Sequence, residues 1–459
     1  MPAAPVNYPS PPAAPVPADA RLAYVLAHFR QAYTDVPAVA VGYAGSGAPV
    51  EVADRAGAFF SQPQPQPAAP NWRDWRGQRV PFFFDDEARP LLTLTPGRAE
   101  IAADIISAAF YLLSGWQEYF SVERDRHGRF PYAGSVQQRF GFVALPVVNY
   151  YFDVLKTAIE HVAGRPLHLR RWAGGAPLAA FITHDVDSLH GGWGTAARHR
   201  LRRGQMLPLL RLLWNRARHG RGPWDNLEQV QAETARYGAP STFFILGDVW
   251  PAANGVLNAD YGAHAPAFLE RLSRLAATGA EIASHGSYGT AENAGRLAQE
   301  LAALGTLVPR GNRFHYLCWD PSRTPGVLAQ AGVGYDSTLG FAEHFGFRHS
   351  YCLPFFPFDF ARGRAYDFLE IPLNVMDTTL HHPHYLQLGP DDVLPALAPM
   401  LAEIEKFGGV ATVLWHNQNF DPANAVNGPR QFHEIMGWLR GHGAAFRTGR
   451  EIWAEFPAA

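Results

Sequence analysis

The C-terminal two thirds of the chain alternates short apolar runs with amphipathic stretches. After Pro177 the apolar runs are LAAFITHD, STFFILGD, AEIASHGS, NRFHYLCW, FLEIPLNV and VATVLWHN. Segments with apolar residues at helical spacing lie between these runs, at 265–278, 291–304, 390–407 and 429–442. Strands that alternate with helices are typical of a parallel sheet, because each parallel connection needs a crossover. We therefore predict an α/β fold over 177–455, with a sheet that is open or closed into a barrel.

The first third of the chain has a different pattern. Residues 1–20 are rich in proline and alanine and offer little for burial, which predicts a disordered or extended arm. Apolar residues at helical spacing predict a main helix over 99–120 and a second helix within 142–164, starting just past Pro146. A proline-rich run, SQPQPQPAAPNW, predicts an irregular connection. We expect a smaller accessory α+β domain at 21–165 that packs on the C-terminal domain.

Composition narrows the classes of protein that fit. Hydrophobic residues make up 47% of the 459 residues and charged residues 17%, which indicates a globular protein of two domains. The formal charge of −2 offers no general attraction to nucleic acid, and we expect no nucleic-acid partner. Cys318 and Cys352 are too few for a disulfide framework. The sequence begins with no basic and apolar leader and contains no run long enough to span a membrane, so we expect a cytoplasmic location.

Ionisable residues recur near the C-terminal ends of the predicted strands. They are Asp185, Asp187, His285, Arg313, His315 and His416. The carboxyl ends of parallel strands meet at one edge, where α/β folds build their sites, so one shared pocket is expected. Carboxylate and imidazole together suit zinc or a neighbouring divalent ion. Any single one of the 19 histidines is most simply a structural residue, but three at equivalent strand ends indicate a metal site.

Four short motifs, in order along the chain, resemble those of a known family. They are THDVD at 183–187, EIASHGSYGT at 281–290, RFHY at 313–316 and LWH at 414–416. The sequence resembles the polysaccharide deacetylase family, also called the NodB homology domain or carbohydrate esterase family 4, over about 177–450. The ordered recurrence of four motifs is more specific than any one of them. The resemblance implies a distorted parallel (β/α) barrel.

The resemblance also implies a reaction and a role for each motif residue. The expected function is a metal-dependent hydrolase that removes an acetyl group from an N-acetylated carbohydrate or glycan precursor, with water activated by the metal. Asp185 corresponds to the catalytic base and His416 to the general acid. Arg313 corresponds to the residue that orients the base. Asp187 and His285 correspond to metal ligands.

This chain departs from the family pattern at its second metal histidine. The family places that histidine four residues after the first, where Gly289 stands here. His315 occupies a position where the family usually has proline. We therefore hypothesise that His315 replaces the missing ligand, so that Asp187, His285 and His315 hold a divalent ion, with zinc the leading candidate.

Two further segments have no assigned function. LLSGWQEY at 112–119 and RDRHGRFPYAGS at 124–135 resemble an uncharacterised domain that precedes a divergent subset of these deacetylase-like proteins. We expect that domain to shape the cleft. The stretch 198–221 carries eight arginines and no acidic residue. We interpret it as a solvated helical insertion rather than a binding surface.

Several alternatives remain open at this point. HGSYG at 285–289 nearly spells a nucleophile elbow around Ser287, but the first glycine of that motif is a histidine here. A catalytically degenerate carbohydrate-binding protein would not need both a base and an acid. Hydrolysis of another non-peptide C–N bond fits the same residues. Asp377 is a candidate to orient the general acid. The HHPH segment at 381–384 is left out of the set of metal ligands. Trp319 and Trp415 fit equally well as core residues or as residues that stack on a sugar.

Overall fold

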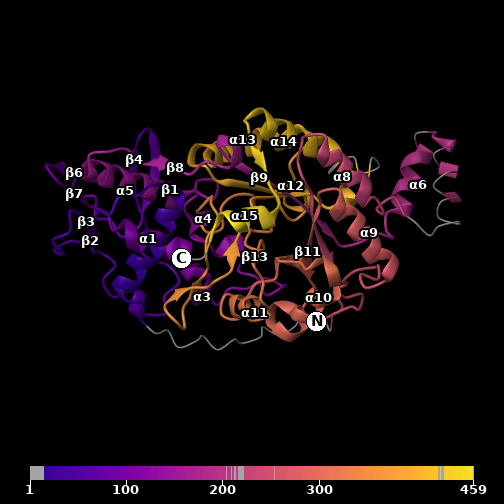
Figure 1. Ribbon diagram of the computed structural model, residues 1–459, viewed down its shortest axis with the longest axis horizontal. Helices are drawn as coiled ribbons and strands as arrows, with labels where there is room; N and C mark the ends of the chain where they lie inside the picture. Colours follow the sequence, from indigo (N-terminus) through magenta and orange to yellow (C-terminus); the bar gives the residue numbers. More distant parts are fainter. Residues whose placement is uncertain are drawn as a thin grey trace.

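The fold is α/β, with a curled parallel sheet preceded by a smaller α+β region. The computed structural model describes residues 15–202, 204–207, 209–210, 213–214, 222–252, 254–421, 424 and 428–457. Figure 1 shows the N-terminal region at the left, in indigo and purple, and the parallel sheet with its helices at the centre and right. This architecture confirms the predicted fold class.

The N-terminal region combines three long helices with small sheets. Its helices are α1 Ala18–Ala32, α2 Ile105–Leu113, α3 Trp116–Phe120, α4 Val136–Arg139 and α5 Val147–Ala163. Its strands are β1 Tyr33–Thr34, β2 Val41–Tyr43, β3 Val50–Val52, β4 Asn71–Trp75, β5 Gln78–Phe82, β6 Leu92–Thr95, β7 Arg98–Ile101 and β8 His168–Leu169. The main sheet has the order β2-β3-β7-β6, in which only β6 is antiparallel to its neighbour. The run 61–72 that was predicted to be irregular follows a short 3-10 turn that ends at Ser61, and it has no helix or strand before β4 begins at Asn71.

The predicted helix over 99–120 ends at Phe120 as expected, but it starts later than predicted and is divided into two helices. Residues Arg98–Ile101 form β7, and α2 starts only after Asp104, whose side chain accepts a hydrogen bond from the backbone N–H of Ser107. This N-cap satisfies a helix donor at that point and therefore favours a later start. Gly115 adopts a φ of 73° and separates α2 from α3, because a left-handed residue cannot continue a helix. The second predicted helix, starting just past Pro146, is confirmed as α5.

Secondary structure begins earlier in the chain than predicted. Residues 1–14 of the expected arm lie outside the described residues. Val16 is only 5% exposed, and its carbonyl accepts a hydrogen bond from the Arg21 guanidinium at 2.7 Å. Helix α1 begins at Ala18, with Asp19 in its first turn, where a negative charge complements the helix dipole. Buried anchoring of Val16 therefore extends the ordered region upstream of Arg21.

The parallel sheet forms the core of the C-terminal part. Its strands are β9 Ala179–Val186, β10 Thr242–Leu246, β11 Glu281–Gly286, β12 Gly311–Phe314, β13 Tyr335–Asp336, β16 Leu369–Glu370, β17 Val375–Met376, β18 Val410–Leu414 and β19 Ala445–Phe446. The order is β16-β13-β12-β11-β10-β9-β18-β17, with β19 also beside β9. Every residue of β9 is buried, which is typical of a parallel strand covered on both faces.

The run FLEIPLNV, predicted as one strand, forms two. β16 lies near its start and pairs with β13, and β17 begins at its last residue, Val375, and pairs with β18. Pro372 lies between them and has no backbone N–H to donate to a continuous ladder. The two edges of the sheet are therefore joined by one bent chain segment instead of by a strand ladder.

Helices cover the outside of the sheet, as the amphipathic segments predicted. The described helices of this part are α6 Trp193–Arg202, which does not lie on the sheet, α8 Leu227–Ala235, α9 Pro266–Ala277, α10 Ala294–Ala303, α11 Thr324–Ala331, α12 Asp377–His381, α13 Val393–Phe407, α14 Pro429–Gly441 and α15 Gly449–Glu455. A short hairpin, β14 Phe358–Asp359 with β15 Arg364–Ala365, leaves the sheet. No helix in the described ranges has both the length and the apolar character needed to cross a bilayer.

The arginine-rich stretch projects away from the rest of the molecule. Helix α6 lies at the far right of Figure 1 and begins this insertion. Leu201 is 60% exposed and Leu207 is 73% exposed. Much of 203–221 lies outside the described residues. The part that is described agrees with a solvated helical insertion.

The N-terminal region packs directly on the barrel. A two-point salt bridge joins Glu118 of α3 to Arg348 of the barrel, with N–O distances of 2.7 and 2.6 Å, and both residues are buried. The Val148 N–H donates to the Ser350 carbonyl at 2.9 Å. A single apolar core runs through both parts. The domain limits at 21–165 and 177–455 therefore stay predictions, since buried contacts cross them.

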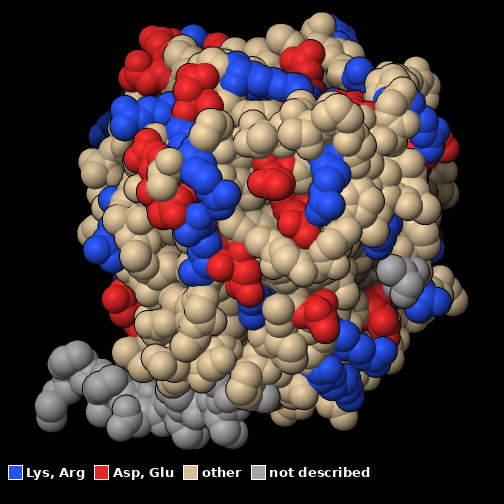
Figure 2. All heavy atoms as spheres, turned by 90° about the vertical axis from the view of Figure 1, so that its left-hand side faces the viewer, with Lys and Arg blue, Asp and Glu red and all other residues tan. Residues whose placement is uncertain are grey.

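One face of the N-terminal region is visible in space-filling form in Figure 2. Acidic and basic side chains alternate over it, and among the residues described there neither sign forms a continuous field. This mixed surface agrees with the near-zero net charge of the chain.

Replacing Glu118 with glutamine tests the packing of the two parts. The change leaves the Arg348 guanidinium buried without a counter-charge, so we expect the free energy of unfolding to fall by about 3–5 kcal/mol. The matched control is Glu270→Gln, which breaks an exposed pair with Arg274 (side chains 74% and 63% exposed) and should cost less than about 1 kcal/mol. Urea unfolding of both variants measures the difference. Equal small losses would show that the buried pair does not hold the two parts together.

Candidate metal centre

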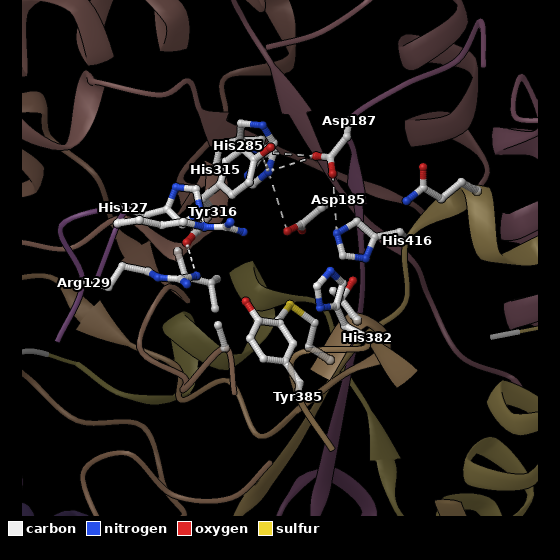
Figure 3. Close-up of a pocket in the computed structure, with 16 residues that line it drawn as sticks. His127, Arg129, Asp185, Asp187, His285, His315, Tyr316, His382, Tyr385 and His416 are labelled. Atoms are coloured by element: carbon white, nitrogen blue, oxygen red, sulfur yellow. Dashed lines mark hydrogen bonds and ion pairs between the residues drawn. The ribbon is translucent and has the colours of Figure 1, made fainter. Parts of the chain in front are cut away.

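A pocket of about 190 Å³ opens at the edge of the sheet where the predicted strand-end residues meet. Its walls include Asp185, Asp187, His285, His315 and His416. Arg313 lies directly behind this wall, fully buried, and contacts Asp185. Figure 3 shows Asp185 between the pair of histidines from β11 and β12 and His416 from the end of β18. All six predicted site residues therefore come together at one place.

Strand geometry explains this convergence. Thr183, Asp185 and Asp187 occupy alternate positions along and just beyond β9, so their side chains share one face. His184 points the other way, where its ring contacts the Trp415 carbonyl at 2.8 Å. In the parallel pair β11–β12, His285 is in register with Arg313, and His315 follows two residues later.

Three potential ligand atoms form a nearly equilateral triangle. The distances are 3.3 Å from Asp187 Oδ1 to His285 Nε2, 3.5 Å from Asp187 Oδ1 to His315 Nδ1, and 3.2 Å between the two imidazole nitrogens. In a tetrahedral zinc site with metal–ligand bonds of about 2.0–2.1 Å, two ligand atoms lie roughly 3.3 Å apart. One ion can therefore reach all three atoms without rearrangement of the site.

Each of the two histidines is oriented by a backbone carbonyl. His285 Nδ1 lies 2.8 Å from the Arg313 carbonyl, and His315 Nε2 lies 3.2 Å from the Leu257 carbonyl. A carbonyl can only accept, so each of these nitrogens carries the proton and the other nitrogen presents its lone pair to the triangle. Burial lowers the pKa of His315 to about 4, which favours the neutral ring that a metal requires.

The charge balance of the triangle also fits a cation. Asp187 Oδ1 is buried and has no hydrogen-bond partner among the described residues. Burial would raise the pKa of Asp187, but His315, His285 and His416 hold it below its usual range, so the carboxylate is ionised. Burial opposes a charge on His285, yet Asp185 and Asp187 raise its pKa. The space between the three atoms therefore favours positive charge, and a divalent ion fits the donor set.

Asp185 is held by a fixed guanidinium. Arg313 Nη1 donates to Asp185 Oδ1 at 2.9 Å and to Thr183 Oγ1 at 2.8 Å. The same guanidinium donates to the Ser337 carbonyl at 2.8 Å and lies 4.4 Å from the centre of the Phe244 ring. Because Arg313 has no freedom to move, it fixes the position of the carboxylate, whose other oxygen lies 3.7 Å from His285 Nε2.

His416 is paired with a second buried carboxylate. Its Nδ1 lies 2.7 Å from Asp377 Oδ1, and its backbone N–H donates to Asp377 Oδ2 at 2.7 Å. Asn419 also donates to Asp377 Oδ2, at 2.6 Å. Burial would lower the pKa of His416, but the Asp377 carboxylate raises it to about 10. The free Nε2 lies 3.6 Å from Asp187 Oδ2, so His416 presents a proton to the pocket.

The sequence predicted that the N-terminal domain shapes the cleft, but it did not identify the residues that form the outer wall of the pocket. Arg126, His127 and Arg129 come from the N-terminal region, and His382 and Tyr385 come from the loop after α12. The first three belong to the segment 124–135, which has no assigned function in the sequence analysis. This segment lies at the pocket because of contacts between residues far apart in the chain, and local sequence patterns do not predict such contacts.

The remaining candidate residues lie in the core or outside the triangle. Ser287 is 1% exposed, and its hydroxyl accepts from the Asp248 N–H at 3.1 Å, so it is not an accessible nucleophile. Trp319 and Trp415 are buried core residues and do not line the pocket. His381 contacts the Leu388 carbonyl, which agrees with leaving the HHPH segment out of the ligand set.

Comparisons with known proteins extend to part of the chain. A family of unknown function (DUF7033) matches residues 22–163. No curated protein matches the sequence. Similar solved structures include Puue allantoinase (15% identity, TM-score 0.40, 62% of this chain and 91% of that one) and a probable polysaccharide deacetylase from Pseudomonas aeruginosa PAO1 (15%, 0.39, 62% and 92%). Another is the Bc1960 peptidoglycan N-acetylglucosamine deacetylase (12%, 0.28, 61% and 90%). TM-scores this low carry no argument about function.

Replacing His315 with alanine tests the triangle. Removing one of three ligands should lower zinc affinity by more than about 100-fold, because even residues that only orient ligands contribute 10–100-fold. The control is His442→Ala, an exposed histidine at the end of α14 that pairs with Glu405. Metal content after dialysis and competition with a chelator measure both variants. Equal zinc binding by His315→Ala and the wild type would exclude His315 as a ligand.

Proposed function

We propose that the protein is a metal-dependent hydrolase that removes an acetyl group from an N-acetylated carbohydrate. The observation that carries the proposal is the position of the ligand triangle, between a carboxylate fixed by Arg313 and a protonated histidine fixed by Asp377. The ordered motifs of the sequence support the same reaction. Asp187, His285 and His315 would hold the ion.

The proposed first half of the reaction uses the ion and Asp185. A divalent ion would polarise the acyl carbonyl and lower the pKa of water from 15.7 to about 7. Asp185 takes a proton from the attacking water, since its carboxylate is fixed on the inner wall by Arg313. The hydrogen bond from Arg313 keeps the Asp185 carboxylate pointing into the pocket.

The proposed second half of the reaction uses His416. Its Nε2 faces the pocket and its Nδ1 is bound to Asp377, so the ring has one available proton in a fixed direction. His416 donates this proton to the departing amine, which would otherwise be too poor a leaving group. Asp377 acts through His416 and is therefore a positioning residue.

The pocket walls favour a small acyl group. Leu317, Ala342 and Met376 form an apolar cluster and line the same pocket. A methyl group packed there would leave water, a gain of about 0.8 kcal/mol per carbon buried. This cluster supports an acetyl group on the substrate. The cytoplasmic location expected from the sequence would make the substrate a glycan precursor.

Acetate release from a panel of N-acetylated sugars and oligosaccharides tests the activity. We expect at least one member to release acetate, with the activity lost in the presence of a chelator and restored by zinc. Cyclic amides in the same panel test hydrolysis of another C–N bond. Acetate release that is unchanged by the chelator would show that the reaction does not need the metal. Binding of sugars without turnover of any compound would identify a carbohydrate-binding protein.

Two substitutions test the roles of the base and the acid. Asp185→Asn and His416→Ala should each lower kcat by about 10²–10⁴-fold on a confirmed substrate, because each removes one proton-transfer group. Both variants should retain zinc, since neither residue belongs to the triangle. The control is Asp391→Asn, an aspartate that is 80% exposed and pairs with Arg430. Near wild-type kcat for Asp185→Asn would contradict its assignment as base.

A further inference from the structure

The loop at 121–131 of the N-terminal region is a rigid turn. Asp125 accepts hydrogen bonds from the backbone N–H groups of His127 and Arg129, at 2.8 and 3.0 Å. It also accepts from Arg129 Nε at 2.7 Å. Gly128 has a φ of 78°, which permits the tight return of the chain. The turn is therefore formed before any ligand arrives.

This turn is attached to the barrel beside the metal ligands. Arg129 Nη1 donates to the Tyr316 carbonyl at 2.8 Å. The His127 ring stacks on the Tyr316 ring, with centroids 4.6 Å apart and planes 24° apart. Tyr316 directly follows His315 in the chain, so the contact fixes the turn relative to the triangle. Figure 3 shows His127 and Arg129 on the side of the pocket away from Asp187.

The charges along the pocket are divided between its two ends. The acidic residues of the pocket wall are Asp185 and Asp187, and both are engaged at the inner end. Arg126 and Arg129 lie at the outer end, where Arg129 is paired with Asp125. Arg126 is exposed, donates to His127 Nε2 at 3.0 Å, and forms no ion pair with a carboxylate of the described residues.

Further hydrogen-bonding groups face the same space. His382 and Tyr385 line the pocket together with Arg126 and Arg129. Burial, with smaller contributions from His384 and Arg126, lowers the pKa of His382. The outer wall therefore combines the Arg126 guanidinium, which pairs with no carboxylate of the described residues, with several other polar side chains.

We propose that this outer wall is an oxyanion subsite, and that the substrate carries a phosphate or carboxylate beside its N-acetyl group. The position of the acetyl group rests on the proposed function, whereas the subsite binds without turnover. A neutral sugar gains little from a guanidinium, but a phosphate or carboxylate accepts charge-assisted hydrogen bonds from it. The N-terminal region then determines substrate specificity, with Arg126 as its main binding residue.

Binding to the full-length, zinc-loaded protein tests the subsite without turnover. Calorimetric titration compares glucosamine, glucosamine 6-phosphate, glucosamine 1-phosphate and muramic acid, which separates phosphate from carboxylate. We expect one or more of the anionic sugars to bind about 10–100-fold more tightly than glucosamine, as for hydrogen bonds to charged groups. Arg126→Gln should abolish this preference and Arg126→Lys should retain part of it. The control Arg30→Gln, an exposed arginine of α1, should keep the wild-type preference.

Acetate release from the N-acetylated forms of the same sugars separates the two proposals. If the protein binds the anionic sugars more tightly only when Arg126 is present, and releases acetate from none of the N-acetylated sugars, the subsite is supported and the proposed function is contradicted. Both the subsite and the proposed function would be supported by two results together. The KM for the anionic substrates would be at least 10-fold lower than for N-acetylglucosamine, and it would rise in Arg126→Gln. Equal affinity for neutral and anionic sugars, or a preference that survives Arg126→Gln, would overturn the subsite.

Discussion

The site depends on a positive charge between three buried ligand atoms. Without that charge, the three electron-rich atoms would repel one another. Asp187 Oδ1, His285 Nε2 and His315 Nδ1 lie within 3.5 Å of one another. Carbonyls of Arg313 and Leu257 hold the protons of the two rings on their far sides, so the lone pairs face inward. A cation satisfies all three atoms at once, and the neighbouring Asp185 and His416 are positioned around that point.

The same parallel register that forms the sheet also forms the triangle. His285 pairs in register with Arg313, so the carbonyl of one residue orients the ring of the other, and the Arg313 side chain crosses to Asp185 on β9. His315 lies two residues further along and therefore faces the same space. In the family pattern, the second metal histidine stands where this chain has Gly289. A histidine at position 315 can take its part, because the ends of neighbouring strands converge on a single pocket.

The sequence was sufficient for the barrel and for the residues that gather at its edge. Apolar runs separated by amphipathic segments report strands and helices directly, and α5, α9 and α13 lie close to their predicted limits. It was insufficient where a local signal competes with the pattern. The Asp104 cap and Gly115 divided one predicted helix, and Pro372 divided one predicted strand. The turn at 125–129 reaches the pocket by contacts about 190 residues apart in the chain, which no local pattern encodes.

The most direct test of the account is the location of the ion. A crystal of the zinc-loaded protein, with anomalous diffraction recorded at the zinc edge, gives that location without reference to activity. The account predicts one strong peak at about 2.0–2.2 Å from Asp187, His285 and His315 together. A peak at the HHPH segment, or no peak inside the pocket, would contradict it.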